Sequence, residues 1–139
     1  MAADHAGFEM KEKIKEYVTS KGYEVKDYGT YTDDRADYPD FAHPLAVAVE
    51  ENEFPLGLTF CGSGNGINIT ANKHAGIRSA LCWTAEISAL ARAHNDANVC
   101  AIPARFVSFE EAKAIVDAFL STPFDGGRHQ CRVDKIPIK

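Results

Sequence analysis

Apolar residues recur along the chain with two spacings that alternate. From Met10 to Val18 they repeat every three or four positions, which predicts a helix over residues 8–21 that Gly22 ends. Residues 23–28 alternate apolar with charged side chains, as a half-buried strand does, and residues 29–39 form a polar loop. The same patterns predict helices at residues 40–51, 67–73, 84–94 and 108–120, and strands at residues 56–60, 79–82 and 99–102.

Strands that alternate with amphipathic helices indicate a single α/β domain over residues 1–139. We predict a doubly wound, Rossmann-like fold with a five-stranded, mostly parallel sheet, helices on both faces and a C-terminal helical tail. Ser108 and Glu111 have the spacing of a capping box, and Pro44 is tolerable in its helix because it falls near the first turn. Only residues 1–3 precede Asp4. We therefore expect either an unusually short first strand or the loss of upstream residues.

Composition narrows the class of protein. The 139 residues are 45% hydrophobic, no apolar run approaches the roughly 20 residues of a membrane span, and no signal peptide is recognisable, so we expect a cytoplasmic protein. The four cysteines contain no Cys-x-x-Cys pair, which favours reduced thiols, and Cys82 and Cys100 are predicted core residues. The net charge of −5 argues against a nucleic-acid partner.

Charge is unevenly distributed along the chain. Residues 128–139 hold four basic side chains and one acidic one, a local +3, which leaves −8 for the remainder. A compact positive end on an acidic protein suggests a small anionic ligand, although a solvated basic tail is the alternative interpretation.

The most informative motif is Cys61-Gly-Ser-Gly-Asn-Gly66, which follows the predicted strand at residues 56–60. Glycines at positions 62, 64 and 66 permit positive φ and close approach of a ligand to the backbone, and the next helix adds unpaired N–H groups. A small anion or an oxyanion would find donors here beside a potential base at Cys61. The spacing excludes a dinucleotide fingerprint and a phosphate loop, and Ile67 stands where a cysteine phosphatase needs arginine.

Further polar clusters are predicted at or beyond strand ends: residues 4–7, 94–98 and 126–132. Together with Tyr38-Pro39-Asp40, residues 71–73, residues 76–78 and residues 132–136, they resemble the type B ribose-5-phosphate isomerases and their galactose-6-phosphate and allose-6-phosphate relatives. The resemblance covers nearly the whole chain.

This resemblance implies an aldose–ketose isomerase of the pentose phosphate pathway that works without metal or other cofactor, through a cis-enediolate. The implied catalytic residues are Cys61 as the base, Ser63 as a hydroxyl that helps move protons between O1 and O2, and His94 for ring opening. The implied substrate-binding residues are Asp4, His5, Gly62, Gly64, Asn65, Gly66, Asn95, Arg105, Arg128 and Arg132. Nearby amides and cationic groups are expected to lower the pKa of the Cys61 thiol.

The family also implies a homodimer, or a tetramer, with shared sites in which the partner supplies His94 and Arg105. Asn65 departs from a usual aliphatic residue and bears on which sugar fits. Two alternatives stay open: isomerisation of a six-carbon sugar phosphate, and a non-catalytic sugar-phosphate-binding module. His43, His74 and His129 are interpreted as surface or structural residues.

Overall fold

The computed structural model describes residues 1–138 and contains one four-stranded parallel sheet with the strand order β1-β2-β4-β3. The strands are β1 (Ala2–Ala3), β2 (Gly57–Cys61), β3 (Ser79–Leu81) and β4 (Val99–Pro103). The helices are α1 (Phe8–Ser20), α2 (Tyr38–Glu50), α3 (Asn65–Ala71), α4 (Ala85–Asn95), α5 (Phe109–Ser121) and α6 (Arg128–Val133). None of the helices in this part of the chain has the length and apolar character needed to cross a bilayer.

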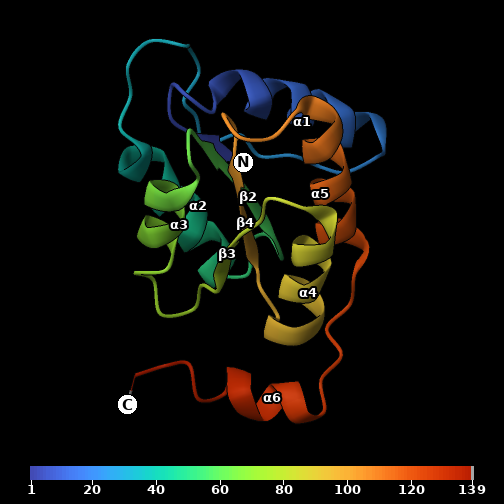
Figure 1. The fold of residues 1–139 in the computed structure, drawn as a ribbon. Helices are drawn as coiled ribbons and strands as arrows, with labels where there is room; N and C mark the ends of the chain where they lie inside the picture. Colours follow the sequence, from blue (N-terminus) through green and yellow to red (C-terminus); the bar gives the residue numbers. More distant parts are fainter. Residues whose placement is uncertain (139) are drawn as a thin grey trace.

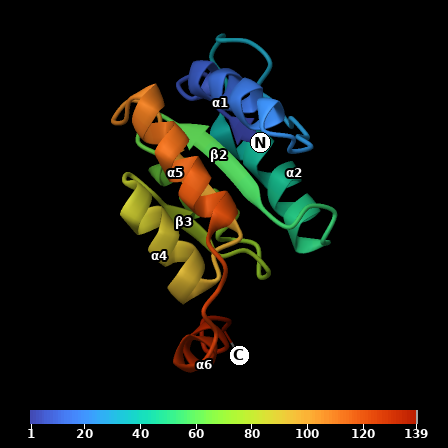
Figure 2. The ribbon, with the colours of Figure 1, turned by 90° about the vertical axis from the view of Figure 1, so that its right-hand side faces the viewer.

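Helices cover both faces of the sheet, as predicted. Figures 1 and 2 show α2 and α3 on one side, and α1, α4 and α5 on the other. Side chains alternate along each strand, so that Leu58 and Phe60 of β2 join the core beneath α1 and α5, whereas Cys61 packs with Ile67 of α3 on the opposite face. This alternation turns the Cys61 side chain toward the start of α3.

The fifth predicted strand, residues 23–28, is not formed. This segment meets residues 1–3 through few bonds: the Met1 amino group donates to the Lys26 carbonyl at 2.7 Å, the Tyr28 N–H to the Met1 carbonyl at 2.9 Å, and the Thr30 N–H to that of Ala3 at 2.8 Å. Because β1 has only two residues, too few backbone groups are available to extend a regular ladder along residues 23–27. The sheet therefore has four strands rather than five.

Helix boundaries also refine the prediction. The Ser108–Glu111 capping box is confirmed: the Glu111 N–H donates to Ser108 Oγ, and the Ser108 N–H donates to Glu111 Oε1, each at 3.1 Å. Helix α2 begins at Tyr38, before the expected start at Asp40. Pro44 therefore lies inside the helix, and the expectation that it falls near the first turn is wrong. Its missing N–H leaves the Asp40 carbonyl without the usual helical donor.

The connections from β1 and from β2 lead away in opposite directions. From β1 the chain passes through α1 to the outer segment at residues 23–30, whereas from β2 it passes through α3 to β3 at the other edge of the sheet. Parallel sheets bind ligands where neighbouring strands lead away in opposite directions, just beyond their carboxyl ends. Here those ends carry Asp4 and Cys61.

Candidate active site

Cys61 is the last residue of β2, and its side chain is buried, with 4% of its surface exposed. Asp4 follows β1 and is also buried. The parallel register pairs Ala3 with Phe60, which brings Asp4 beside Cys61. Asp4 is fixed in place because its Oδ1 accepts the Gly7 N–H at 3.0 Å. A thiol and a carboxylate are thus neighbours at the carboxyl ends of β1 and β2.

The loop after Cys61 directs backbone amides at the sulfur. Gly64 adopts a left-handed conformation (φ 78°), and α3 follows at once. This helix begins at Asn65, whereas the sequence predicted a start at Ile67. The N–H groups of Ile67, Gly64 and Gly66 lie close enough to the thiol to favour its ionised form. These are amides of a helix start, which have no partner inside the helix. The expected cradle of donors is therefore present.

Positive φ accounts for only one of the three glycines. Among the three, only Gly64 has positive φ. Gly66 is required for space instead, because a Cβ there would clash with the ring of Tyr38. A Cβ on Gly62 would lie 3.3 Å from the guanidinium of Arg105. Close packing against Tyr38, rather than backbone conformation, thus explains Gly66.

The pKa of Cys61 is raised above its ordinary value, so the predicted lowering is wrong for this chain. Burial is the largest cause, because it penalises the thiolate, and the negative charge of Asp4 raises the pKa further. The N–H groups of Ile67, Gly64 and Gly66 act in the opposite direction but do not outweigh burial. Cys61 is consequently a strong base when ionised, although only a small fraction is ionised at neutral pH.

Arg105 lies at the loop of its own chain, which corrects the expectation that a partner supplies it. Its N–H donates to the Gly62 carbonyl at 3.0 Å, and its side chain is exposed beside the same glycine. Ser63 is exposed in the loop, where its Oγ accepts the Asn65 N–H at 3.3 Å. His5 is exposed at the end of β1, with the Ala36 N–H 3.2 Å from its Nδ1.

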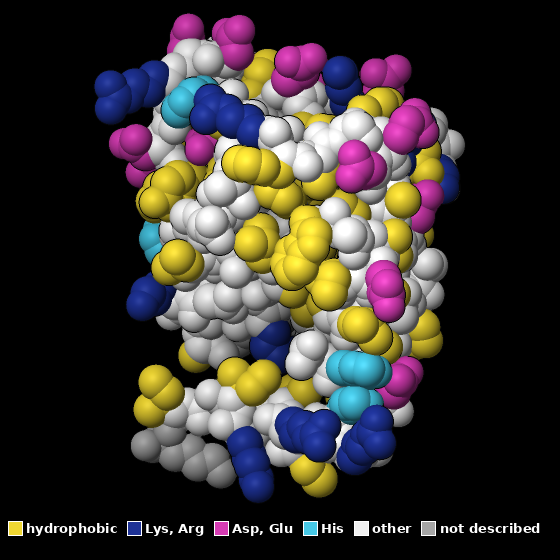
Figure 3. Space-filling model, viewed as in Figure 1, with side chains coloured by type: hydrophobic (Ala, Val, Ile, Leu, Met, Phe, Trp, Pro, Cys, Tyr) yellow, Lys and Arg dark blue, Asp and Glu magenta, His cyan; other side chains and the backbone are white. Residues whose placement is uncertain are grey.

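The other predicted residues lie at the opposite end of the molecule. His94 and Asn95 end α4, and Arg128 and Arg132 belong to α6, which Figure 1 shows far from the carboxyl ends of the strands. Figure 3 shows basic and histidine side chains gathered around α6. Lys139, part of the predicted basic end, lies outside the described residues. One chain therefore does not bring the arginine pair or His94 to Cys61.

His129, which the sequence indicates to be a surface or structural residue, is buried, with 8% exposure, and stacks on His94 with ring centroids 4.2 Å apart. Asp125 lies beside both rings. A sequence signal for this arrangement exists in Gly126-Gly127, because both glycines adopt positive φ and turn the chain back beneath α4.

An apolar cavity of about 300 Å³ lies away from this chemistry, between residues 23–28, residues 54–58 and Met1. It contains none of the predicted site residues. The convergence of Asp4, Cys61 and the α3 amides, rather than this cavity, therefore marks the candidate active site.

Large hydrophobic side chains are exposed on one face of the molecule. Figure 3 shows them gathered on the face between α3 and α4. Ile69 of α3 is 60% exposed, Trp83 before α4 is 51% exposed, and Phe106 after β4 is 75% exposed. Monomeric soluble proteins rarely expose several such side chains together, and such groupings mark interaction sites.

Comparison with known proteins identifies the family of this chain. The family model described as Ribose/Galactose Isomerase matches residues 1–136. Ribose-5-phosphate isomerase B of Escherichia coli is 47% identical over 133 residues, which cover 96% of this chain and 89% of that protein. The probable ribose-5-phosphate isomerase B of Mycoplasma genitalium is 44% identical, over 98% of this chain and 91% of that protein.

Solved structures agree as well. A ribose 5-phosphate isomerase from Thermotoga maritima superposes with a TM-score of 0.96 at 50% identity, covering 98% of this chain and 94% of that one. Ribose-5-phosphate isomerase B from Mycoplasma genitalium, solved with bound ribulose-5-phosphate, has a TM-score of 0.93 at 44% identity, covering 97% and 90%. With the family match over residues 1–136, these likenesses show that the chain belongs to the ribose/galactose isomerase family.

Proposed function

We propose that this protein interconverts ribose 5-phosphate and ribulose 5-phosphate, with Cys61 as the base. The observation that carries the proposal is the buried thiol of Cys61 beneath the amides of Gly64, Gly66 and Ile67, in a chain that matches the family over almost its full length. Relatives named ribose-5-phosphate isomerase B, one of them solved with ribulose-5-phosphate bound, support this substrate.

In the proposed reaction the Cys61 thiolate removes the proton from C2 of the open-chain aldose. The C–H electron pair forms the C1–C2 double bond, and the carbonyl electrons move to O1, giving a cis-enediolate. Proton exchange between O1 and O2, assisted by Ser63, and delivery of the proton from Cys61 to C1 complete the ketose. Donors aimed at a developing oxyanion are each worth about 3 kcal/mol, which gives the loop amides a catalytic role.

The same proposal includes a homodimer that completes each site. His94, Asn95, Arg128 and Arg132 are separated from Cys61 by the length of the domain, so in one chain they cannot act on a sugar bound at the thiol. The exposed Ile69, Trp83 and Phe106 supply apolar surface for a second copy. A symmetric dimer would then present His94 of one subunit to Cys61 of the other.

In this arrangement, His94 would open the furanose ring, and Arg128 and Arg132 would bind the phosphate. The two arginines are four residues apart on α6 and exposed, so both guanidinium groups can face one ligand. Asp4, His5, Asn95 and Arg105 would hold the remaining sugar and phosphate oxygens. A cytoplasmic location belongs to the proposal, because a catalytic thiol must stay reduced, and all four cysteines are free.

A coupled assay of ribulose 5-phosphate formation tests the proposal. We expect Cys61→Ala to lower turnover by at least about 100-fold, since general bases contribute roughly 10²–10⁴-fold. Cys131→Ser is the matched control, because Cys131 is exposed and is not assigned to the site. Undiminished turnover of Cys61→Ala would remove Cys61 from the mechanism.

A six-carbon substrate is the second candidate, because the matching family includes galactose isomerases. Asn65 is exposed at the start of α3, where its side chain can limit the length of the sugar. Turnover of ribose 5-phosphate, allose 6-phosphate and galactose 6-phosphate, measured side by side, separates these substrates. Binding of all three without turnover would instead indicate a non-catalytic module.

A further inference from the structure

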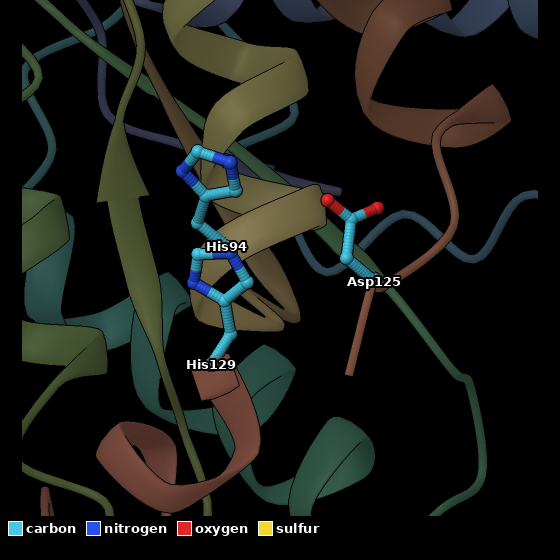
Figure 4. A group of neighbouring side chains, drawn as sticks. All are labelled: His94, Asp125 and His129. Atoms are coloured by element: carbon cyan, nitrogen blue, oxygen red, sulfur yellow. The ribbon is translucent and has the colours of Figure 1, made fainter. Parts of the chain in front are cut away.

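Three potential metal ligands meet at the junction of α4 and α6. They are His94, Asp125 and His129, and each offers one ligand atom within 4.8 Å of the others. Figure 4 shows the two imidazole rings one above the other, with the carboxylate of Asp125 beside their edges. No other group of three histidine, cysteine or acidic side chains among residues 1–138 has ligand atoms that converge in this way.

The fold holds the three side chains together through the backbone. The Asp125 N–H donates to the Ala93 carbonyl at 3.0 Å, which ties the loop before α6 to the end of α4. The left-handed Gly126 and Gly127 then turn the chain so that His129 stacks on His94 with the rings 9° from parallel. The cluster is thus a feature of the fold rather than of three long, mobile side chains.

The ligand atoms are not committed to other protein groups. Within the described chain, no hydrogen bond involves the side chain of His94, Asp125 or His129, although His129 is buried. The other histidine cluster differs, since His43 Nδ1 lies 2.7 Å from His74 Nε2 and the rings bond each other directly.

We propose that His94, Asp125 and His129 form a binding site for a divalent transition-metal ion of the zinc type. Two imidazoles and one carboxylate, with a water in the fourth position, are a donor set that Zn²⁺ uses in open sites. Ligand atoms in a zinc tetrahedron lie about 3.3 Å apart, so each ring must tilt out of the parallel stack and close by about 1 Å. Hard ions such as Mg²⁺ prefer oxygen ligands and are excluded by the two imidazoles.

Zinc at this site would act as a reversible inhibitor, a consequence that rests on the proposed function. A metal-bound imidazole of His94 has no free lone pair with which to exchange a proton with the sugar. Zinc would therefore lower the rate of ring opening.

Binding is tested without substrate by titrating Zn²⁺ into the full chain while following heat and the ¹⁵N signals of the histidine rings. We expect one zinc per chain, with the signals of His94 and His129 shifting together. His129→Ala should weaken binding by at least about tenfold, because even indirect partners of a zinc-bound histidine are worth roughly 10- to 100-fold in affinity. Asp125→Asn, an isosteric change at an exposed position, should also weaken it.

Two control variants locate the zinc. His74→Ala disrupts the other histidine pair, and Cys131→Ser removes the exposed thiol, so neither should change the affinity for zinc. Affinity that survives both His129→Ala and Asp125→Asn, or that falls in either control, would overturn the proposed site, as would no binding at millimolar zinc. If zinc binds as expected but the protein isomerises none of the sugar phosphates, the proposed function fails while the site stands. If the protein is an active isomerase that zinc binds without inhibiting, the inhibitory role is refuted.

Discussion

A subunit-mixing experiment tests whether each site is shared between two chains. Cys61 lies at the carboxyl end of β2, whereas His94 ends α4 at the opposite end of the domain. Cys61→Ala and His94→Ala should therefore each be inactive alone, because each removes one half of every site. In a mixed dimer, however, one of the two sites receives Cys61 from one chain and His94 from the other.

The size of the recovery follows from this arrangement. Random pairing of equal amounts makes half of the dimers mixed, and each mixed dimer has one intact site of two, so about a quarter of wild-type activity should return. The two variants are co-expressed with different tags, or unfolded and refolded together. Ribulose 5-phosphate formation is then measured relative to the total amount of protein. The mixture is compared with each parent variant treated in the same way.

Cys61→Ala mixed with Ser63→Ala is the matched control. Cys61 and Ser63 belong to the same site on one chain, at the end of β2 and in the loop that follows. In a mixed dimer each of the two copies of this segment carries one of the two changes, so neither site is intact. This mixture should stay at the level of its parents. Recovery in the control, or none in the Cys61→Ala and His94→Ala mixture once mixed dimers are demonstrated, would refute the shared site.

Two further predictions concern electrostatics. Lys11 is fully buried, and its Nζ lies 2.6 Å from Asp27 Oδ2. Asp27→Asn should therefore lower the free energy of unfolding, measured by urea denaturation, by about 3 kcal/mol. As the control, Glu9→Gln breaks an exposed pair and should lower it by less than about 0.5 kcal/mol. Burial raises the pKa of Asp27, but hydrogen bonds from Lys11 and other donors outweigh burial and leave the pKa lowered. The stabilisation from this pair should therefore be present above about pH 4 and lost in acid. An equal loss of stability in the Asp27 and Glu9 variants would contradict the buried pair. Because burial and Asp4 raise the pKa of Cys61, its alkylation by iodoacetamide, mapped by mass spectrometry, should rise with pH beyond the usual thiol midpoint of about 8.5, and Asp4→Asn should move the midpoint lower. A midpoint below 8.5 in the unaltered protein would contradict this account.

Local sequence patterns predicted most of the secondary structure because their causes are local. The Ser108–Glu111 capping box involves groups three residues apart, and the apolar spacing of residues 8–21 depends only on the helical period. The segment at residues 23–28 failed for a non-local reason. Its pattern fits a strand, but a strand exists only where a neighbour supplies backbone partners, and β1 supplies them only near Tyr28.

The features of the candidate site are likewise of two kinds, those fixed by neighbouring residues in the sequence and those fixed by packing. The sequence by itself determined that a cysteine precedes a glycine loop and a helix start, because those features lie within six residues of one another. Only the tertiary structure decided that burial and Asp4 raise the pKa of Cys61 and that Arg105 lies at its own loop. It also decided that His94 stacks on His129, far from the thiol. A pKa and a distance between elements depend on everything that packs around a group, and residues remote in the sequence supply most of that surrounding.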